Sequence, residues 1–160
     1  SDNHNAFALQ RAAQHNIACH IVDAANTSRN EFNAQLASAV QAFQPDIVVL
    51  AGFMRLLTMA FLAHFPQRVI NVHPALPGEL PGTHAIARAF DEFVAGKRTH
   101  TGVMVHFVSD EGVDNGPVIE SAIVPIHPSD SLADLEQRMH ATEHQLLINA
   151  LTQLTKEHTP

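Results

Sequence analysis

The sequence predicts an α/β protein with a doubly wound, mostly parallel sheet of the Rossmann type. Residues 46–52 (DIVVLAG) and 68–72 (RVINV) are continuous apolar runs, typical of parallel strands that are covered on both faces. Segments with helical spacing precede, separate and follow these runs. In such folds ligands bind beyond the carboxyl ends of the strands, so the residues after the two runs are expected to face one crevice.

The first half of the chain is expected to alternate in this way. Ser28 can cap a helix that runs to about Phe43, and Pro45 ends that helix. The other elements expected here are a helix over 5–15, a short strand over 17–22 and a short helix over 58–65 between the two apolar runs.

The second half adds a helix over 83–96 and strands over 101–108 and 117–124. Asp and Gly residues in the loop 110–116 predict a tight connection between those two strands. From Ser131 the apolar residues follow the spacing of a long amphipathic helix, and Ser131-x-x-Asp134 resembles a helix cap.

Composition bounds the class of protein. With 160 residues and 46% hydrophobic content, residues 1–160 are expected to form a single domain. A net charge of −7 without a Lys/Arg cluster disfavours a nucleic-acid partner.

The only cysteine, Cys19, excludes an intrachain disulfide and is expected to be a small core residue. No apolar run is long enough to span a bilayer, so we expect no membrane contact and a cytoplasmic location. The twelve histidines include no HExxH pair, and no metal site is expected.

Asn71, His73 and Asp114 are the candidate catalytic residues. An amide can donate to a developing oxyanion, an imidazole can transfer a proton, and a carboxylate can orient the imidazole and favour its charged form. Together these groups suit acyl or formyl transfer. A polar strand end explains Asn71 and His73 equally well, and a tight turn explains Asp114 better when that residue is considered alone.

Four motifs together resemble the phosphoribosylglycinamide formyltransferase family: AGFMRLL (51–57), INVHPAL (70–76), PGTHA (81–85) and HFVSDEGVDNGPVI (106–119). The resemblance covers nearly the whole chain. It implies transfer of a formyl group from 10-formyltetrahydrofolate to the amine of glycinamide ribonucleotide in de novo purine biosynthesis. It also implies small-molecule partners, a formyltransferase-like fold and no metal.

The resemblance assigns roles to individual residues. Asn71 matches the donor to the formyl oxygen, His73 the catalytic acid, and Asp114 the carboxylate that raises the pKa of the histidine and keeps it protonated near neutrality. His106 either supports Asp114 or is a satisfied core histidine.

Other residues match the binding sites of the family. The folate site is expected to comprise Arg29, Met54, Arg55, Leu56, Leu57, Asn71, Asp110, Glu111, Gly112, Val113 and Asp114. The nucleotide side is expected to comprise Pro74, His140, Thr142 and Glu143, with Glu143 on the ribose hydroxyls. A solvated side chain explains Arg29 as well, and a surface carboxylate explains Glu143 as well.

Two features depart from the family. The family opens with a strand and a GxGSN loop that holds the nucleotide phosphate, and nothing in this sequence matches them. We therefore expect an N-terminally truncated domain, missing the first βαβ portion, whose activity alone is open. In the loop 74–82, Pro77-Gly78-Glu79 replaces the usual pattern and is expected to add a negative charge beside the substrate.

Three alternative functions stay open. The chain could be a 10-formyltetrahydrofolate deformylase, another folate-dependent formyltransferase acting on an aminoacyl-tRNA or a sugar amine, or a non-catalytic folate-binding fragment. The family's own pattern is favoured because deformylases usually carry a second histidine after the catalytic one, where this chain has Pro74. Homodimerisation, or pairing with a complementing N-terminal fragment, is also left open.

Overall fold

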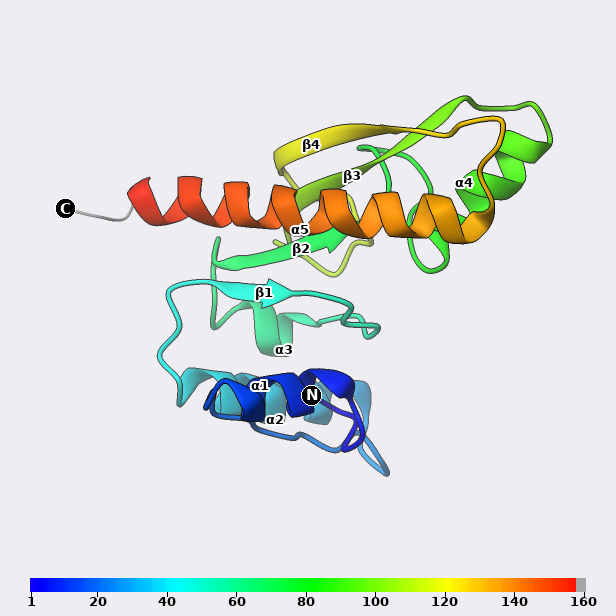
Figure 1. The fold of residues 1–160 in the computed structure, drawn as a ribbon. Coiled ribbons are helices and arrows are strands. Elements are labelled where there is room, and N and C mark those ends of the chain that lie inside the picture. The colour runs from blue at the N-terminus through cyan, green and yellow to red at the C-terminus, as the bar shows by residue number, and fades with distance from the viewer. Residues whose placement is uncertain (158–160) are drawn as a thin grey trace. The chain divides into compact units, whose positions relative to one another are not determined.

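A computed structural model describes residues 1–157 of the chain. These residues form two compact units. The first unit comprises residues 1–46 and 57–66, and the second comprises residues 47–56 and the chain from residue 67 onward. Figure 1 labels the helices and strands of both units.

The described part of the first unit is helical, with α1 (Phe7–Gln14), α2 (Arg29–Gln41) and α3 (Met59–Leu62). Ser28 caps α2 as expected, because its hydroxyl accepts from the Glu31 N–H at 3.2 Å and the Glu31 carboxylate accepts from the Ser28 N–H at 2.8 Å. Asn33 is fully buried and accepts from the Thr58 N–H at 2.9 Å, which ties α2 to the start of α3. The three helices expected in this region are confirmed.

The strand expected over 17–22 is wrong. Val22 donates its N–H to the Ser1 carbonyl at 3.0 Å, and the Ser1 amino group donates to the His20 carbonyl at 3.0 Å, but no ladder develops from these contacts. A strand needs a neighbouring strand to satisfy its backbone groups, and the described part of this unit offers only helices. Cys19, expected in the core, is exposed in the same segment.

The second unit contains a four-stranded sheet in the order β1 (Val48–Leu50), β2 (Val69–His73), β3 (His100–Phe107) and β4 (Val118–Pro125). The α/β class is confirmed. Only β1 and β2 pair in parallel, whereas β2–β3 and β3–β4 are antiparallel, so the described sheet is mixed and not mostly parallel as expected. For β3 and β4 the physical reason is the loop 108–117, which reverses the chain and makes these two strands a hairpin.

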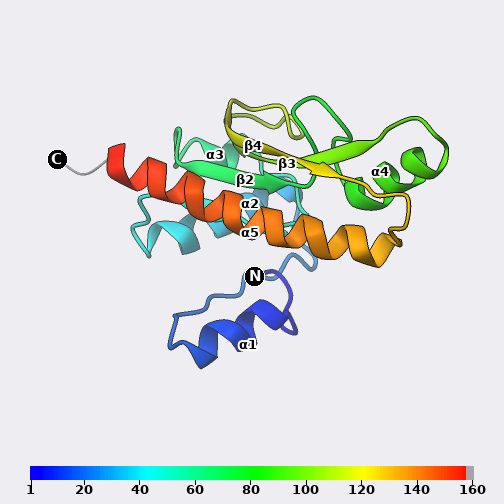
Figure 2. The ribbon, with the colours of Figure 1, turned by 45° about the horizontal axis from the view of Figure 1, so that its top comes forward.

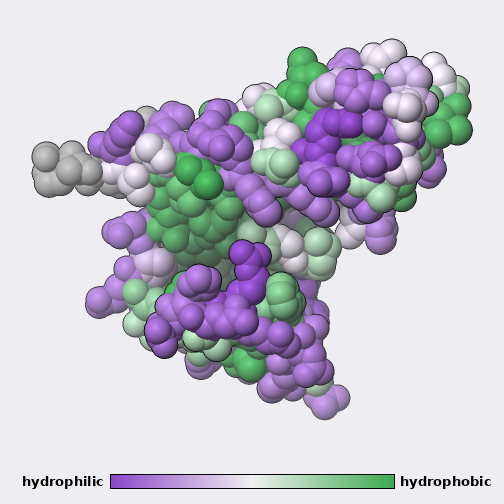
Figure 3. Space-filling model, viewed as in Figure 1, coloured by the Kyte–Doolittle hydropathy of each residue, from purple (hydrophilic) through white to green (hydrophobic). Residues whose placement is uncertain are grey.

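Two helices complete the second unit, α4 (Ala85–Val94) and α5 (Leu132–Glu157). Figures 1 and 2 both show α5 running along the sheet. Its apolar side meets Val103 and Val105 of β3 in the main core, and the helix itself contributes Leu135, Met139, Leu146, Ala150 and Leu154. In Figure 3 hydrophilic side chains cover part of the surface along α5, and a hydrophobic region lies beside them at the C-terminal half of the helix.

The start of α5 is capped as the sequence predicts. The Ser131 hydroxyl accepts from the Asp134 N–H at 3.3 Å, and the Asp134 carboxylate accepts from the Ser131 N–H at 2.9 Å. Among the helices of residues 1–157, none combines the length and the apolarity that a bilayer crossing needs.

Candidate active site

The register of β2 and β3 brings three polar side chains to one face of the sheet. Asn71 and His73 are two residues apart in β2, and His106 of β3 lies directly opposite Asn71. Val103 and Val105 of β3 belong to the core under α5, so the alternate residue His106 faces the other side. His73 and His106 are almost completely buried.

The loop after β3 supplies the carboxylate. Asp114 has a left-handed backbone with φ of 51°, which Asp tolerates better than most residues. Gly116, two residues later, packs against the end of β3. A Cβ at this position would lie 1.8 Å from the Phe107 carbonyl oxygen, so only glycine fits there. The packing of this loop against β3 places Asp114 on the face of the sheet that carries Asn71, His73 and His106.

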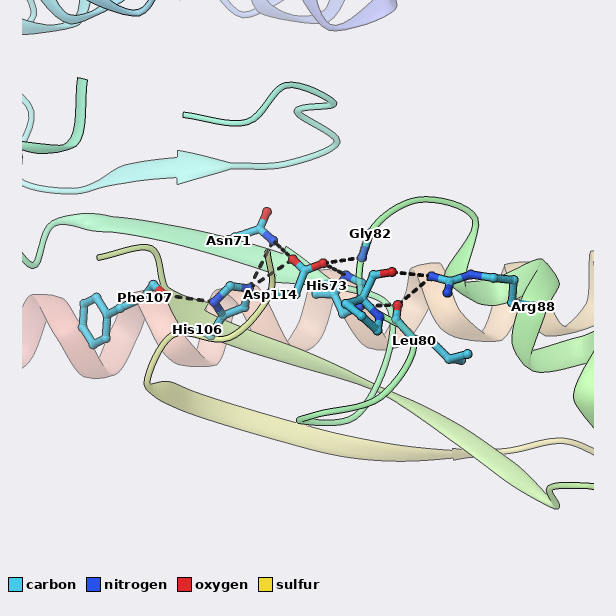
Figure 4. Close-up of polar contacts among 9 residues, drawn as sticks. Asn71, His73, Leu80, Gly82, Arg88, His106, Phe107 and Asp114 are labelled. Atoms are coloured by element: carbon cyan, nitrogen blue, oxygen red, sulfur yellow. Dashed lines mark hydrogen bonds and ion pairs between the residues drawn. The ribbon is translucent and has the colours of Figure 1, made fainter. Parts of the chain in front are cut away.

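Asp114 holds the cluster together, as Figure 4 shows. One carboxylate oxygen, Oδ2, lies 3.2 Å from His73 Nδ1 and accepts from the Gly82 N–H at 2.8 Å. The other, Oδ1, accepts from Asn71 Nδ2 at 3.2 Å and lies 3.6 Å from His106 Nε2. The three candidate catalytic residues that the sequence predicted are therefore in direct contact.

The orientation of the Asn71 amide follows from its neighbours. His106 Nδ1 lies 2.9 Å from the Phe107 carbonyl, so this nitrogen carries the hydrogen, and His106 Nε2 is left to accept from Asn71 Nδ2 at 3.2 Å. A reversed amide would put its oxygen against the carboxylate of Asp114. Both Asn71 hydrogens are thus engaged, and its Oδ1 points away from both partners (Figure 4). Donation to a formyl oxygen, the role expected of Asn71, requires it to release one of these hydrogen bonds.

His73 is subject to opposing effects on its pKa. Burial disfavours the charged imidazolium and is the largest effect, whereas the charge of Asp114 and the Leu80 carbonyl, 3.1 Å from Nε2, favour it. The net result is a pKa below the ordinary histidine value. The expectation that Asp114 keeps His73 protonated near neutrality is therefore wrong, because burial outweighs the carboxylate.

Asp114 itself is held as a carboxylate. Burial tends to raise the pKa of this group, but the Gly82 N–H and the neighbouring His73 ring favour the carboxylate, and the net result is a pKa below the ordinary aspartate value. The site therefore combines an ionised Asp114 with a His73 that is mainly neutral at neutral pH.

The loop 74–82 contributes to the site through its backbone. The Leu80 carbonyl lies 3.1 Å from His73 Nε2 and accepts from Arg88 Nη2 at 2.8 Å, and the Pro81 carbonyl accepts from Arg88 Nη2 at 2.7 Å. The motif PGTHA includes Gly82, but the sequence indicated no role for Leu80, Gly82 or Arg88. Only the Pro and Gly residues of the segment signal a loop that folds back on the site.

Glu79 in the same loop was expected to place a negative charge beside the substrate. Its carboxylate instead pairs with Arg98, with 2.9 Å between Arg98 Nη1 and Glu79 Oε2. Arg98 also pairs with Glu92, so the three side chains together retain a negative charge, and its place beside the substrate stays a prediction.

The residues expected at the folate site fall in both units. In the second unit, Met54 is 77% exposed and Leu56 48% exposed, so both side chains stand open to solvent beyond β1. Asp110, Glu111, Gly112 and Val113 are also exposed, and the Asp110 carboxylate accepts from the Gly112 N–H at 2.7 Å, which shapes the loop. Arg55 is exposed as well. Arg29 and Leu57 belong to the first unit, where Arg29 Nη2 donates to the Leu57 carbonyl at 3.4 Å.

The residues expected on the nucleotide side lie at two places in the second unit. Pro74 directly follows His73 and is half-buried. His140, Thr142 and Glu143 share α5, where the Thr142 hydroxyl donates to the Arg138 carbonyl at 3.0 Å. Burial raises the pKa of Glu143, and the neighbouring His140 and His144 oppose that rise.

Within residues 1–157, no group of three or more His, Cys, Asp or Glu side chains is arranged to hold a metal ion.

An α/β domain that presents an amide, an imidazole and a carboxylate in contact suits an enzyme that transfers a group at a carbonyl carbon. Residues 1–151 match the model of the formyl transferase family, and the chain belongs to that family.

Two similar proteins and one similar crystal structure carry the same name. The phosphoribosylglycinamide formyltransferase of Dictyostelium discoideum is 37% identical, over 97% of this chain and 82% of that protein. The protein of the same name from Escherichia coli is 41% identical, over 91% of this chain and 67% of that protein. A crystal structure of phosphoribosylglycinamide formyltransferase from Streptococcus pneumoniae superposes with a TM-score of 0.90 at 31% identity, covering 97% of this chain and 84% of that one.

Proposed function

We propose that this chain transfers a formyl group from 10-formyltetrahydrofolate to the amine of glycinamide ribonucleotide, a step of de novo purine biosynthesis. The observation that carries the proposal is the direct contact of Asp114 with both Asn71 and His73. Family membership and the names of the relatives support the choice of donor and acceptor.

His73 is the proton carrier in this proposal. Because its pKa lies below the ordinary histidine value, the imidazole begins mainly as the neutral base. As the substrate amine attacks the formyl carbon, the amine becomes acidic and His73 takes its proton. The imidazolium then returns a proton to the departing folate nitrogen.

Asp114 stabilises the imidazolium that forms during the reaction. It is ionised beforehand and lies 3.2 Å from His73 Nδ1, so it needs no reorganisation when the charge appears. Asn71 lies beside the same carboxylate, and its amide stabilises the tetrahedral oxyanion after it exchanges a hydrogen bond with His106 or Asp114 for one with the substrate.

The binding roles of other residues are part of the proposal. Within the second unit, the folate is held by the segments 54–56 and 110–114, and the nucleotide by Pro74 and by His140, Thr142 and Glu143 of α5. The raised pKa of Glu143 suits a carboxyl that meets ribose hydroxyls in a partly dehydrated position. Homodimerisation remains a prediction.

The test is a formyl-transfer assay with 10-formyltetrahydrofolate and glycinamide ribonucleotide. The chain is assayed alone and behind the strand and GxGSN loop that the family resemblance implies, with His73→Ala as the inactive control and the exposed His127→Ala as its matched partner. Formylated nucleotide that disappears only with His73→Ala supports the proposal. Formate released without the acceptor favours a deformylase, and bound folate without turnover in either form favours a binding fragment.

A further inference from the structure

Arg98 lies between two carboxylates on different segments. Its Nη1 is 2.9 Å from Glu79 Oε2, and its Nε and Nη2 are each 2.7 Å from Glu92 Oε2. The Arg98 side chain is 15% exposed, so these charge-assisted hydrogen bonds are less screened than those of a surface pair. Glu92 belongs to α4, whereas Glu79 belongs to the loop 74–82 beside the active site.

The loop 74–82 has a backbone that needs support. Gly78, Leu80 and Gly82 all have positive φ, of 80°, 44° and 81°. For Leu80 the left-handed conformation is strained, because its Cβ comes too close to the backbone carbonyl oxygen that follows. A loop with this strain keeps one conformation only if contacts with its surroundings hold it.

Two backbone groups of that loop meet the catalytic pair. The Leu80 carbonyl lies 3.1 Å from His73 Nε2, and the Gly82 N–H donates to Asp114 at 2.8 Å. Glu79 is the residue next to Leu80, so a movement of Glu79 is passed directly to the carbonyl on His73.

We propose that Arg98 is a positioning residue that acts through Glu79: the ion pair fixes the loop 74–82 so that Leu80 meets His73 and Gly82 meets Asp114. The consequence for turnover rests on the proposed formyl transfer, whereas the effect on loop geometry does not. Arg88, which donates to the Leu80 and Pro81 carbonyls, is a second support, so loss of the ion pair loosens the loop without releasing it.

Glu92 provides a matched control. Its carboxylate accepts from the same guanidinium, and its exposed fraction of 39% is close to the 37% of Glu79, but it is not part of the loop. If Arg98 served only to stabilise the end of α4, it would not act on the loop 74–82 through Glu79. Removal of Glu79 would then affect the contacts of Leu80 and Gly82 no more than removal of Glu92.

The substrate-free test is hydrogen exchange at the Gly82 amide, measured by NMR. We expect Glu79→Ala to accelerate this exchange about tenfold, because the N–H spends more time away from Asp114. Glu79→Gln, which can still accept from Arg98, and Glu92→Ala should each stay within about twofold of the unchanged chain. Unaltered exchange in Glu79→Ala, or equal acceleration in Glu92→Ala, would overturn the proposal.

The kinetic test uses the same variants with 10-formyltetrahydrofolate and glycinamide ribonucleotide. Glu79→Ala should lower kcat about tenfold and change KM for either substrate by less than about twofold. A rise in KM with unchanged kcat would overturn positioning and make Glu79 a substrate contact. If no form of the chain transfers formyl, the proposed function fails while hydrogen exchange still decides the role of Arg98. If Glu79→Ala does not fold, Glu79→Asp keeps the charge but shortens the side chain, and should again exceed Glu92→Ala in exchange at Gly82.

Discussion

Nδ1 of His73 lies 3.2 Å from Oδ2 of Asp114, within a site where His73 is only 3% exposed. Burial and the carboxylate act on the imidazole in opposite directions, and burial has the larger effect on its pKa. The pair is therefore set to carry a proton transiently, with the imidazole neutral at rest and its carboxylate partner already charged.

Replacing Asp114 with Asn removes the charge but keeps a side chain of similar shape. We expect kcat for formyl transfer to fall about a hundredfold or more, since the imidazolium loses its counter-charge. The pKa of His73 should fall further, because the main effect that opposes burial is lost. Steady-state kinetics and an NMR titration of His73 measure the two effects. Asp91→Asn, at an exposed position of α4, is the control, and an unchanged kcat in Asp114→Asn would refute the role of the charge.

The pH dependence of kcat/KM should follow the neutral form of His73. The structure lowers the pKa of His73 from its ordinary value of 6.5, so activity should rise with pH and level off with a midpoint below 6.5. Initial rates between pH 5 and 9 check this. A rate that instead declines from pH 6 upward would mean that His73 must start protonated, as the family resemblance first suggested.

Stability should decrease on acidification for a related reason. A group whose pKa is lower in the folded than in the unfolded protein binds fewer protons when folded, so acid favours unfolding. The contribution of His73 is present above pH 6.5 and is lost as the pH falls through its lower folded pKa, and Asp114 behaves likewise below 3.8. Urea unfolding between pH 7 and 5 should show a smaller loss for His73→Gln than for His127→Ala. Equal losses would contradict the burial of a neutral His73.

Gly116→Ala should destabilise the second unit by more than about 2 kcal/mol, because a Cβ would lie 1.8 Å from the Phe107 carbonyl and force the backbone to move. Gly96→Ala is the comparison: unlike Gly116, that residue has a positive φ, of 71°, but nothing lies within 4 Å of its added Cβ, so it should cost only about 1 kcal/mol. Urea unfolding compares the two. Equal losses would show that the loop around Asp114 adapts easily.

Glu143→Gln should raise KM for glycinamide ribonucleotide about tenfold and leave kcat within about twofold, if this residue binds the ribose without touching the reacting atoms. Glu136→Gln, exposed on the same helix, is the control. A loss of kcat at constant KM would remove Glu143 from the binding site.

Local sequence signals predicted most helices and strands because their causes are local. Ser28 and Glu31 form the expected capping box, and the apolar run around β1 and β2 gives two parallel strands. The segment 17–22 has the composition of a strand, but strand formation depends on a partner that composition cannot reveal.

The sequence predicted the residues that contribute side chains to the candidate site, but not those that contribute only backbone groups. Asn71 and His73 occupy one strand, and the family motifs added Asp114. Leu80 and Gly82 act through a carbonyl and an N–H, which every residue possesses, so their identity gives no signal. The lowered pKa of His73 could not be read from the sequence either, because it depends on how much burial opposes Asp114.

The most direct test of the central claim is the rate of glycinamide ribonucleotide formylation by the unchanged chain and by His73→Ala, with substrates saturating. A fall of about a hundredfold or more in His73→Ala, with folate binding retained, is the predicted result. Equal rates in the two proteins would contradict the assignment of His73 as the proton carrier and, with it, the proposed site.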